Sequence, residues 1–242
     1  MKTKVLLSLS AAALVNAAQL SAAPKISSGA YAGVAAGISV LGGKNGFTHT
    51  DDTGARGNQQ IQNQGNFSLS KTSPSLMVFG GYGMKFSGFW TAGEIFYQFD
   101  SMKSKQAPNF GADEKSLSSQ TTGAYGASIH LGFLPSENCV AYAILGVEGR
   151  KFKVKFEDTP PVQIAGKINK NYTSIAFAPG LGMRFSLTKN LSIRTEYKYA
   201  MYKSKKFAVS SENANVAGRT DIVTLKHQPK VHSFNVGMVY SF

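Results

Sequence analysis

Apolar and polar side chains alternate with a period of two along most of the chain after residue 23. The clearest case is residues 191–202, where Leu, Ile, Thr, Tyr and Met side chains occupy one parity and Ser, Arg, Glu, Lys and Ala the other. Successive side chains of a strand point to opposite faces, so this alternation predicts β-strands rather than helices. A single strand of this kind fits a soluble sandwich as well as a membrane barrel.

The number and spacing of these segments favour a barrel. Eight alternating segments occupy residues 30–41, 75–86, 89–101, 121–133, 140–156, 172–187, 191–202 and 231–242. Their connections alternate between long polar stretches (42–74, 102–120, 157–171 and 203–230) and short turns (87–88, 134–139 and 188–190). Long external loops and short periplasmic turns are typical of outer-membrane barrels, and lipid cannot hydrogen-bond an open strand edge. The sequence therefore predicts an all-β, eight-stranded antiparallel transmembrane up-and-down β-barrel over residues 24–242.

The first 23 residues predict a cleaved signal peptide. Lys2 and Lys4 precede an apolar stretch from Val5 to Val15, and small residues follow up to Ala23. A charged start, an apolar middle and a small-residue exit are the three parts of a secretory signal. The alternative is a short buried helix. Export predicts a location in the outer membrane of a Gram-negative cell.

Composition excludes several other classes. The formal net charge is +13, with 16% charged and 43% hydrophobic residues, which is too apolar for a disordered polycation. Charge alone would suggest a nucleic-acid binder, but export argues against that partner. One Cys rules out an internal disulfide framework, and the four His lack zinc-type spacing. We expect no metal and no cofactor.

Charged residues on the inner parity predict a plugged lumen. Unpaired charges in a narrow interior are costly, so they should form an interlocked network of ion pairs that fixes strand register. The alternative is a polar gate that passes small ions when the pairs rearrange. The residues of this predicted network are Glu94, Glu148, Arg150, Arg184, Arg194, Glu196 and Lys198.

Lysines continue the outward parity past the predicted apolar band. They form a predicted collar on the external side that faces the phosphates of lipopolysaccharide, an anionic surface. The alternative is a set of solvated lysines that protect strand ends. The collar consists of Lys151, Lys153, Lys155, Lys167, Lys203 and Lys205.

Two further features concern single strands. Aromatic residues near the short turns predict an interfacial girdle. Pro179 lacks a backbone donor inside a predicted strand, so we expect a β-bulge there. The faces of residues 75–86 are ambiguous from the pattern alone. The predicted girdle consists of Tyr31, Phe86, Phe89, Trp90, Phe133, Phe185, Tyr240 and Phe242.

Four runs resemble one known family. Residues 29–37 (GAYAGVAAG), 178–185 (APGLGMRF), 191–199 (LSIRTEYKY) and 236–242 (VGMVYSF) are similar to the small porin-like outer-membrane β-barrels, which include opacity-type surface antigens and the OmpA-like barrel domain. The resemblance covers essentially the whole mature chain. It implies that the last strand carries the signal read by the barrel-assembly machinery, and that no cell-wall anchoring is expected. That signal would be Phe234, Val236, Met238, Tyr240 and Phe242.

The predicted function is that of an outer-membrane surface protein with a structural or adhesive role. Its partners would be outer-membrane lipid, lipopolysaccharide, the assembly machinery and host or surface ligands of the external loops. The alternative is a small-solute or ion channel, and a less favoured one is a rim-located enzyme. His232 and Ser233 point to opposite faces, and Ser128 and His130 lie inside without an acidic residue nearby in sequence, so we expect no enzyme activity.

Overall fold

The computed structural model describes residues 25–52, 59–106, 109–110, 113–158, 168–212 and 220–242, and the predicted signal peptide lies outside them. Every regular element in these residues is a β-strand, and no helix among them is long and apolar enough to cross a membrane. The strands are β1 (Gly29–Asp52), β2 (Gln59–Phe86), β3 (Phe89–Gln106), β4 (Asn109–Phe110), β5 (Asp113–Ser136), β6 (Cys139–Asp158), β7 (Ile168–Ser186), β8 (Leu191–Tyr202), β9 (Lys205–Glu212) and β10 (Thr220–Ser241).

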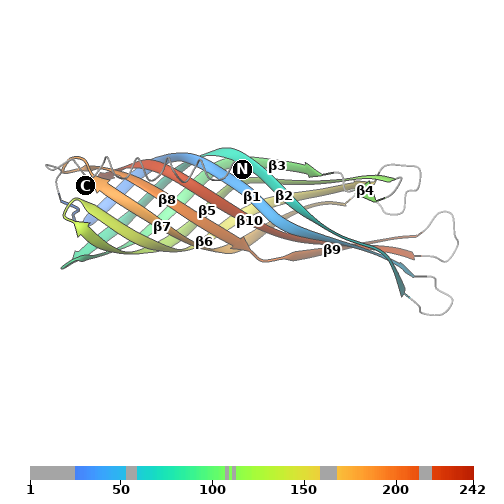
Figure 1. Ribbon diagram of the computed structural model, residues 1–242. Helices are drawn as coiled ribbons and strands as arrows, with labels where there is room; N and C mark the ends of the chain where they lie inside the picture. The colour runs from blue at the N-terminus through green and yellow to red at the C-terminus, as the bar shows by residue number, and fades with distance from the viewer. Residues whose placement is uncertain (1–24, 53–58, 107–108, 111–112, 159–167, 213–219) are drawn as a thin grey trace, which may run out of the picture.

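Eight of these strands close into an antiparallel barrel (Figure 1). The order β1-β2-β3-β5-β6-β7-β8-β10 is completed by pairing of β10 with β1, which runs from Tyr31 opposite Ser241 to Asp52 opposite Thr220. The short strand β4 pairs with β5, and β9 pairs with β10. The predicted fold class is confirmed.

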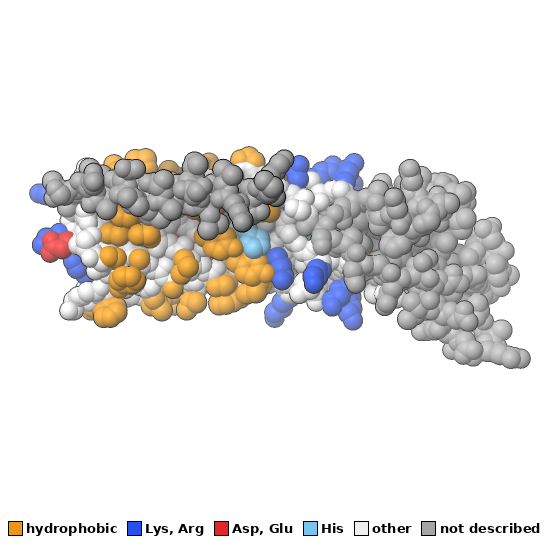
Figure 2. All heavy atoms as spheres, viewed as in Figure 1, with side chains coloured by type: hydrophobic (Ala, Val, Ile, Leu, Met, Phe, Trp, Pro, Cys, Tyr) orange, Lys and Arg blue, Asp and Glu red, His pale blue; other side chains and the backbone are white. Residues whose placement is uncertain are grey.

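The outer wall of the barrel carries an apolar band. Exposed Ile, Leu, Val, Phe, Tyr and Met side chains lie on all eight barrel strands, and Figure 2 shows part of this belt on one face of the molecule. Strand β2, whose faces were ambiguous in sequence, presents Leu76 and Val78 outward and buries Met77 and Phe79. Apolar side chains outside and polar ones inside are the arrangement of a barrel in a bilayer.

The aromatic girdle is only partly present. Phe86, Phe89 and Phe133 are exposed near the short-turn end, as are the C-terminal Tyr240 and Phe242, while Phe185 is half-buried. Tyr31 and Trp90 are buried inside, with 4% and 3% of their surface exposed, so their assignment to the girdle was wrong. Both belong to the inward parity of their strands, because their neighbours Ala30 and Phe89 point outward.

The strands continue well past the apolar band. Residues 42–52, 59–74, 102–106, 205–212 and 220–230, predicted as parts of external loops, are paired strand. They are rich in Asn, Gln, Ser and Gly, which have weak strand propensity, but pairing with a neighbouring strand overrides propensity. We call this extension the turret.

Two interruptions in pairing divide the turret wall into two sheets. Strand β2 pairs with β3 only from Ser75 to Phe86, and β7 pairs with β8 only from Ala176 onward. Beyond these points β2, β1, β10 and β9 form one sheet, and β3, β5, β6 and β7 form the other. Figure 1 shows the two groups separating at the end opposite the short turns.

The expected bulge at Pro179 is absent. Phe177 pairs with Met201 and Gly180 with Lys198 in one unbroken register, with no pairs to β8 at the two residues between them. On its other side Pro179 pairs with Leu145. The barrel thus accommodates the missing N–H of Pro179 by a local loss of pairing with β8. No extra residue is inserted into the strand.

We expect Gly33→Val to disrupt barrel closure. A Cβ at Gly33 would lie 2.2 Å from the carbonyl oxygen of Met238 on β10 and 2.3 Å from Cζ of Phe79. Neither a backbone carbonyl nor a buried ring can move away easily, so we expect a loss of about 3 kcal/mol of folding free energy. Urea unfolding in detergent measures it, with lipid-facing Val34→Ile as the matched control. Equal stability of the two variants would contradict the close packing at this seam.

Candidate functional site

One charged group lies in the lumen between β3 and β8. Arg194 donates to both carboxylate oxygens of Glu94, at 2.5 and 3.2 Å, and its Nη2 lies 3.3 Å from Glu196 Oε2. Tyr31 donates to Glu94 at 3.1 Å and Tyr142 to Glu196 at 2.9 Å. All five residues are buried. One guanidinium therefore joins two carboxylates, and two phenols complete their hydrogen bonding.

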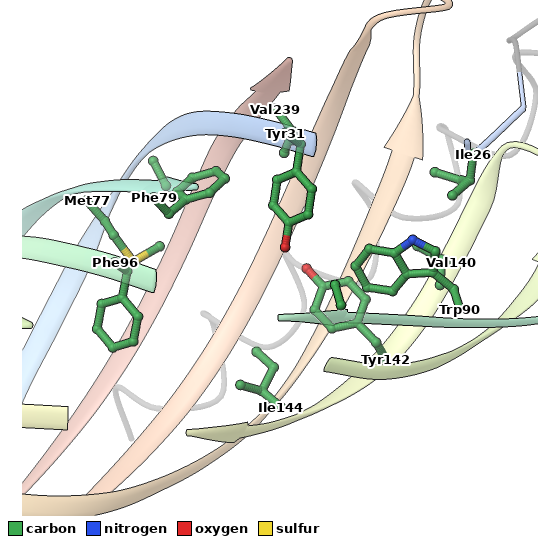
Figure 3. Packing of buried hydrophobic residues seen from close by; sticks show 12 residues of the cluster. Ile26, Tyr31, Met77, Phe79, Trp90, Phe96, Val140, Tyr142, Ile144 and Val239 are labelled. Carbon is green, nitrogen blue, oxygen red and sulfur yellow. The ribbon is translucent and has the colours of Figure 1, made fainter. Parts of the chain in front are cut away.

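An apolar cluster surrounds this group, with Trp90 on its short-turn side and Phe96 on its other side (Figure 3). Figure 3 shows the hydroxyl ends of Tyr31 and Tyr142 directed toward each other, with Trp90 beside Tyr142. The ring centroids of Trp90 and Tyr142 are 5.6 Å apart, and the guanidinium carbon of Arg194 lies 3.3 Å from the ring centroid of Phe79. Aromatic rings thus exclude water from the ion pair and also contact its cation.

A second charged group lies farther along the lumen, toward the turret. Arg150 Nη1 lies 2.5 Å from Asp100 Oδ1, and its Nε lies 3.8 Å from Glu148 Oε1. Tyr202 donates to Glu148 and accepts from Arg150 Nε at 3.0 Å. Gln98 adds a bond from its Nε2 to Asp100 at 3.0 Å. Arg150 is fully buried, so its charge depends on these partners.

The seven residues predicted as one network are all buried, but they divide into separate sets. Among the residues that the structure describes, Arg184 and Lys198 form no ion pair: Arg184 donates to Ser241 at 2.7 Å, and Lys198 Nζ lies 3.6 Å from the ring centroid of Phe96. Sequence reasoning also left out Asp100, the nearest partner of Arg150. The sequence pattern placed Asp100 on the inward parity of β3, but it could not identify Arg150 on β6 as its partner.

Ser128 and His130 form a hydrogen bond of 3.0 Å in the first charged group. The ligand atoms of His130, Glu94 and Glu196 lie within 4.8 Å of one another, so acidic residues from distant strands do lie near this pair. Arg194 contacts both carboxylates and already supplies a cation that compensates their charge. His232 and Ser233, by contrast, point to opposite faces: Ser233 is buried, while His232 lies 2.7 Å from Tyr197 Oη outside.

The turret has an apolar core of its own. Leu41, Met102, Phe152 and Val231 are buried together there, with Tyr202 at the boundary to the second charged group. Farther out, His227 Nε2 lies 3.2 Å from Ser119 Oγ, and its Nδ1 contacts Tyr172 Oη. Burial lowers the pKa of His227 to about 4 and raises that of Tyr172. The buried interior is thus charged within the apolar band, whereas above it apolar side chains lie beside uncharged polar ones such as Ser119.

Lysines form a band directly beyond the apolar belt (Figure 2). Lys151, Lys155, Lys203 and Lys205 of the predicted collar are exposed and Lys153 is half-buried, whereas Lys167 lies outside the described residues. Sequence reasoning missed further exposed lysines at the same end of the barrel. They are Lys103, Lys105, Lys71, Lys170, Lys206 and Lys226. The outward parity of β3, continued past Phe99, would have identified Lys103 and Lys105.

The family model described as outer membrane protein beta-barrel domain matches residues 6–242. The chain belongs to this family. Its location is therefore the outer membrane of a Gram-negative bacterium, in agreement with the apolar belt around the barrel. No curated protein matches the chain in sequence.

Several solved outer-membrane proteins are similar to the chain at low identity. Ail, the attachment invasion locus protein of Yersinia pestis, is 12% identical over 90% of this chain and 100% of its own, with a TM-score of 0.40. Neisserial surface protein A is 15% identical over 85% and 97%, with a TM-score of 0.33. The outer-membrane protease OmpT of Escherichia coli is 10% identical over 87% and 97%, with a TM-score of 0.44. One of the three is a protease, so these likenesses do not distinguish an enzyme from a surface protein.

Arg194→Met should destabilise the barrel strongly. Removing the guanidinium leaves Glu94 and Glu196 buried without a cation, which typically costs about 3–5 kcal/mol. The triple variant that also carries Glu94→Gln and Glu196→Gln should recover part of this loss. Urea unfolding in detergent measures both, with Lys189→Met in an exposed turn as the control. An Arg194→Met protein as stable as the Lys189→Met protein would show that the group contributes no stability.

The turret should open on mild acidification. The folded turret holds His227 neutral down to about pH 4, while an unfolded His binds a proton below its ordinary pKa of 6.5. Unfolding is therefore favoured as pH falls from 6.5 to 4, by about 3 kcal/mol for the full shift. Hydrogen exchange of turret amides measures this opening. His227→Gln should remove the dependence, and an unchanged profile in that variant would assign it to another group.

Proposed function

We propose that this outer-membrane barrel acts at the cell surface in a structural or adhesive role and does not form an open pore. The observation that carries the proposal is the filled interior combined with a wall that extends far beyond the apolar belt. A pore needs a continuous aqueous path, whereas a surface protein needs area outside the membrane. The described residues provide such an area outside the membrane.

The interior is filled at successive levels. The aromatic cluster surrounds the first charged group, the second charged group follows, and the apolar core of the turret comes last. Eight-stranded barrels have an interior just wide enough for side chains. Opening a path here would require Arg150 and Arg194 to leave their carboxylates. This supports the sealed barrel over the channel alternative.

The turret offers surface for contact with other molecules. In the part of the wall above the apolar belt, β2 pairs with β1 alone and β9 with β10 alone, so each leaves one strand edge for another partner. Extended segments of other proteins can add to such an edge through main-chain hydrogen bonds. These edges support an adhesive role with host or neighbouring surface proteins.

The lysine collar supports a defined depth of the barrel in the outer leaflet. Its described side chains lie beside the apolar belt, and we expect the phosphates of lipopolysaccharide to meet the hydrocarbon at this height. Electrostatic attraction there would fix how deep the barrel sits and orient the turret outward. The collar thus serves the same surface role.

The last strand supports recognition by the barrel-assembly machinery. Val236, Met238 and Tyr240 are exposed on the outer face of β10, Phe242 is exposed directly after it, and Phe234 is partly exposed on the same parity. This strand pairs with β1 and closes the barrel.

We assign no catalytic role to Ser128 and His130. Both are buried in the interior, with 7% and 1% of their surface exposed, beneath the enclosing aromatic cluster. A nucleophile and base need access to a substrate carbonyl, and these two face only other side chains of the barrel. Their hydrogen bond instead completes the first charged group.

Purified protein should give no steady conductance in planar bilayers across a range of salt concentrations. The filled lumen leaves ions no path unless charged pairs separate, which is costly. A wide porin inserted in the same bilayers is the positive control, and heat-unfolded protein sets the leak baseline. Stable conductance steps that increase with salt would favour the channel alternative.

A further inference from the structure

Strand β5 contains an irregularity where the apolar belt meets the collar. Gly123 has a φ of +59°, and pairing shifts by one residue between Thr122 and Ala124 against β6. A Cβ at Gly123 would lie 3.0 Å from Tyr97 Oη in a backbone conformation that side chains rarely adopt. The extra residue reverses the parity of β5, so Thr122 points outward and Ala124 inward.

This bulge forms the floor of a hollow on the outer wall, with a volume of about 710 Å³. Tyr97, Phe99 and Tyr125 line its belt side, and Thr122 and Lys151 line its collar side. The rings of Tyr97 and Phe99 are 4.6 Å apart, and Tyr125 packs over Gly149, where a Cβ would lie 2.8 Å from its Cζ. Three aromatic faces at the membrane boundary thus surround a recess with a cation at its rim.

Asp100 also lines this hollow, and its carboxylate would oppose an anion there. Its side chain is fully buried and is bonded by Arg150 at 2.5 Å and Gln98 at 3.0 Å. Its charge is therefore compensated from inside the barrel. Lys151 remains the charge at the rim.

A second hollow, of about 610 Å³, adjoins the first on its collar side and shares Thr122 and Lys151 with it. Lys153, Asn171 and Thr173 line the second hollow. From the belt outward, the wall thus presents three aromatic rings and then the ammonium group of Lys151. The ammonium group of Lys153 follows, together with the amide of Asn171 and the hydroxyl group of Thr173. That sequence matches an acyl chain, a phosphate and the hydroxyl groups of a sugar.

The lysines of β6 do not lie at a strand edge. Lysine on an unpaired edge strand prevents association of sheets, but β6 pairs with β5 on one side and β7 on the other. The cross-strand neighbours of Lys151 are Thr122 and Thr173, and those of Lys153 are Gln120 and Asn171. Two lysine side chains that leave the same face of one strand about 7 Å apart along its backbone, with neutral cross-strand neighbours, favour an external anion.

We propose that the paired hollows bind one phosphorylated glycolipid of the outer leaflet, with its phosphate on Lys151 and Lys153 and one acyl chain along Tyr97, Phe99 and Tyr125. This inference rests on the proposed collar and narrows it to a single site. The other collar lysines then contribute only general attraction. The bulge at Gly123 is the feature that creates the site.

Native mass spectrometry of the detergent-solubilised protein titrated with phosphorylated lipid A tests this site. Wild-type protein should show one saturable adduct. Lys151→Gln should weaken it about fivefold, the effect of one cation at a charged surface. Thr122→Trp, which fills the hollow, should weaken it at least as much. Lys105→Gln and Ile129→Trp are the matched controls for charge and bulk, since both residues are exposed outside the hollows, and they should bind like the wild type.

Wild-type affinity in both Lys151→Gln and Thr122→Trp would overturn the proposal. Lipid A stripped of phosphate should bind the wild type about 25-fold less tightly, because Lys151 and Lys153 both lose their partner and each contributes about fivefold. Displacement of lipid A by excess inorganic phosphate would show a site for a free anion and would also overturn the lipid assignment. The double variant with Lys203→Gln and Lys205→Gln separates the two proposals. If it weakens lipopolysaccharide binding while the hollow variants do not, the proposed collar is supported and only the proposed site in the hollows is wrong.

Discussion

The need to satisfy every backbone hydrogen bond within hydrocarbon governs this structure. Within the apolar belt each strand pairs on both sides, and the ladder between β1 and β10 closes the ring. The two gaps in pairing begin at Ser75 on β2 and at Ala176 on β7, beside the outer limit of the belt. Water can hydrogen-bond the open edges there, and lipid cannot. The division of the turret into two sheets therefore follows from where the solvent changes.

The same change of solvent explains why the interior reverses character along the barrel. Inside the belt the outer face must be apolar, so polar residues are directed inward, where ion pairs such as Arg194 with Glu94 satisfy them. Above the belt the outer face meets water, and apolar residues such as Phe152 and Leu225 become the interior. The lower half is a membrane barrel and the upper half resembles a soluble β-structure, although the same strands run through both.

Alternation in the sequence was enough to predict the barrel, its strand number and the inward position of all seven charged residues. It was not enough to predict partners, because Glu94 and Arg194 are 100 positions apart and many registers would bury both. It also missed the parity reversal at Gly123, since one inserted residue changes every later side chain without changing the composition. Strand pairing in the turret was invisible for a related reason: its Asn-rich and Ser-rich strands depend on their neighbours and not on local propensity.

Position in the sheet separates two roles for the lysines above the belt. Lys71 on β2, Lys103 on β3 and Lys205 on β9 lie on strands that border a gap, where charge prevents copies of the protein from pairing edge to edge. The same charge would favour partners with acidic segments over basic ones. Lysines on β6 have no edge to protect, and their position beside an aromatic hollow supports the proposed anionic ligand. One band of positive charge can therefore fix the depth of the barrel in the outer leaflet. It can also select which partner proteins bind the open strand edges above the belt.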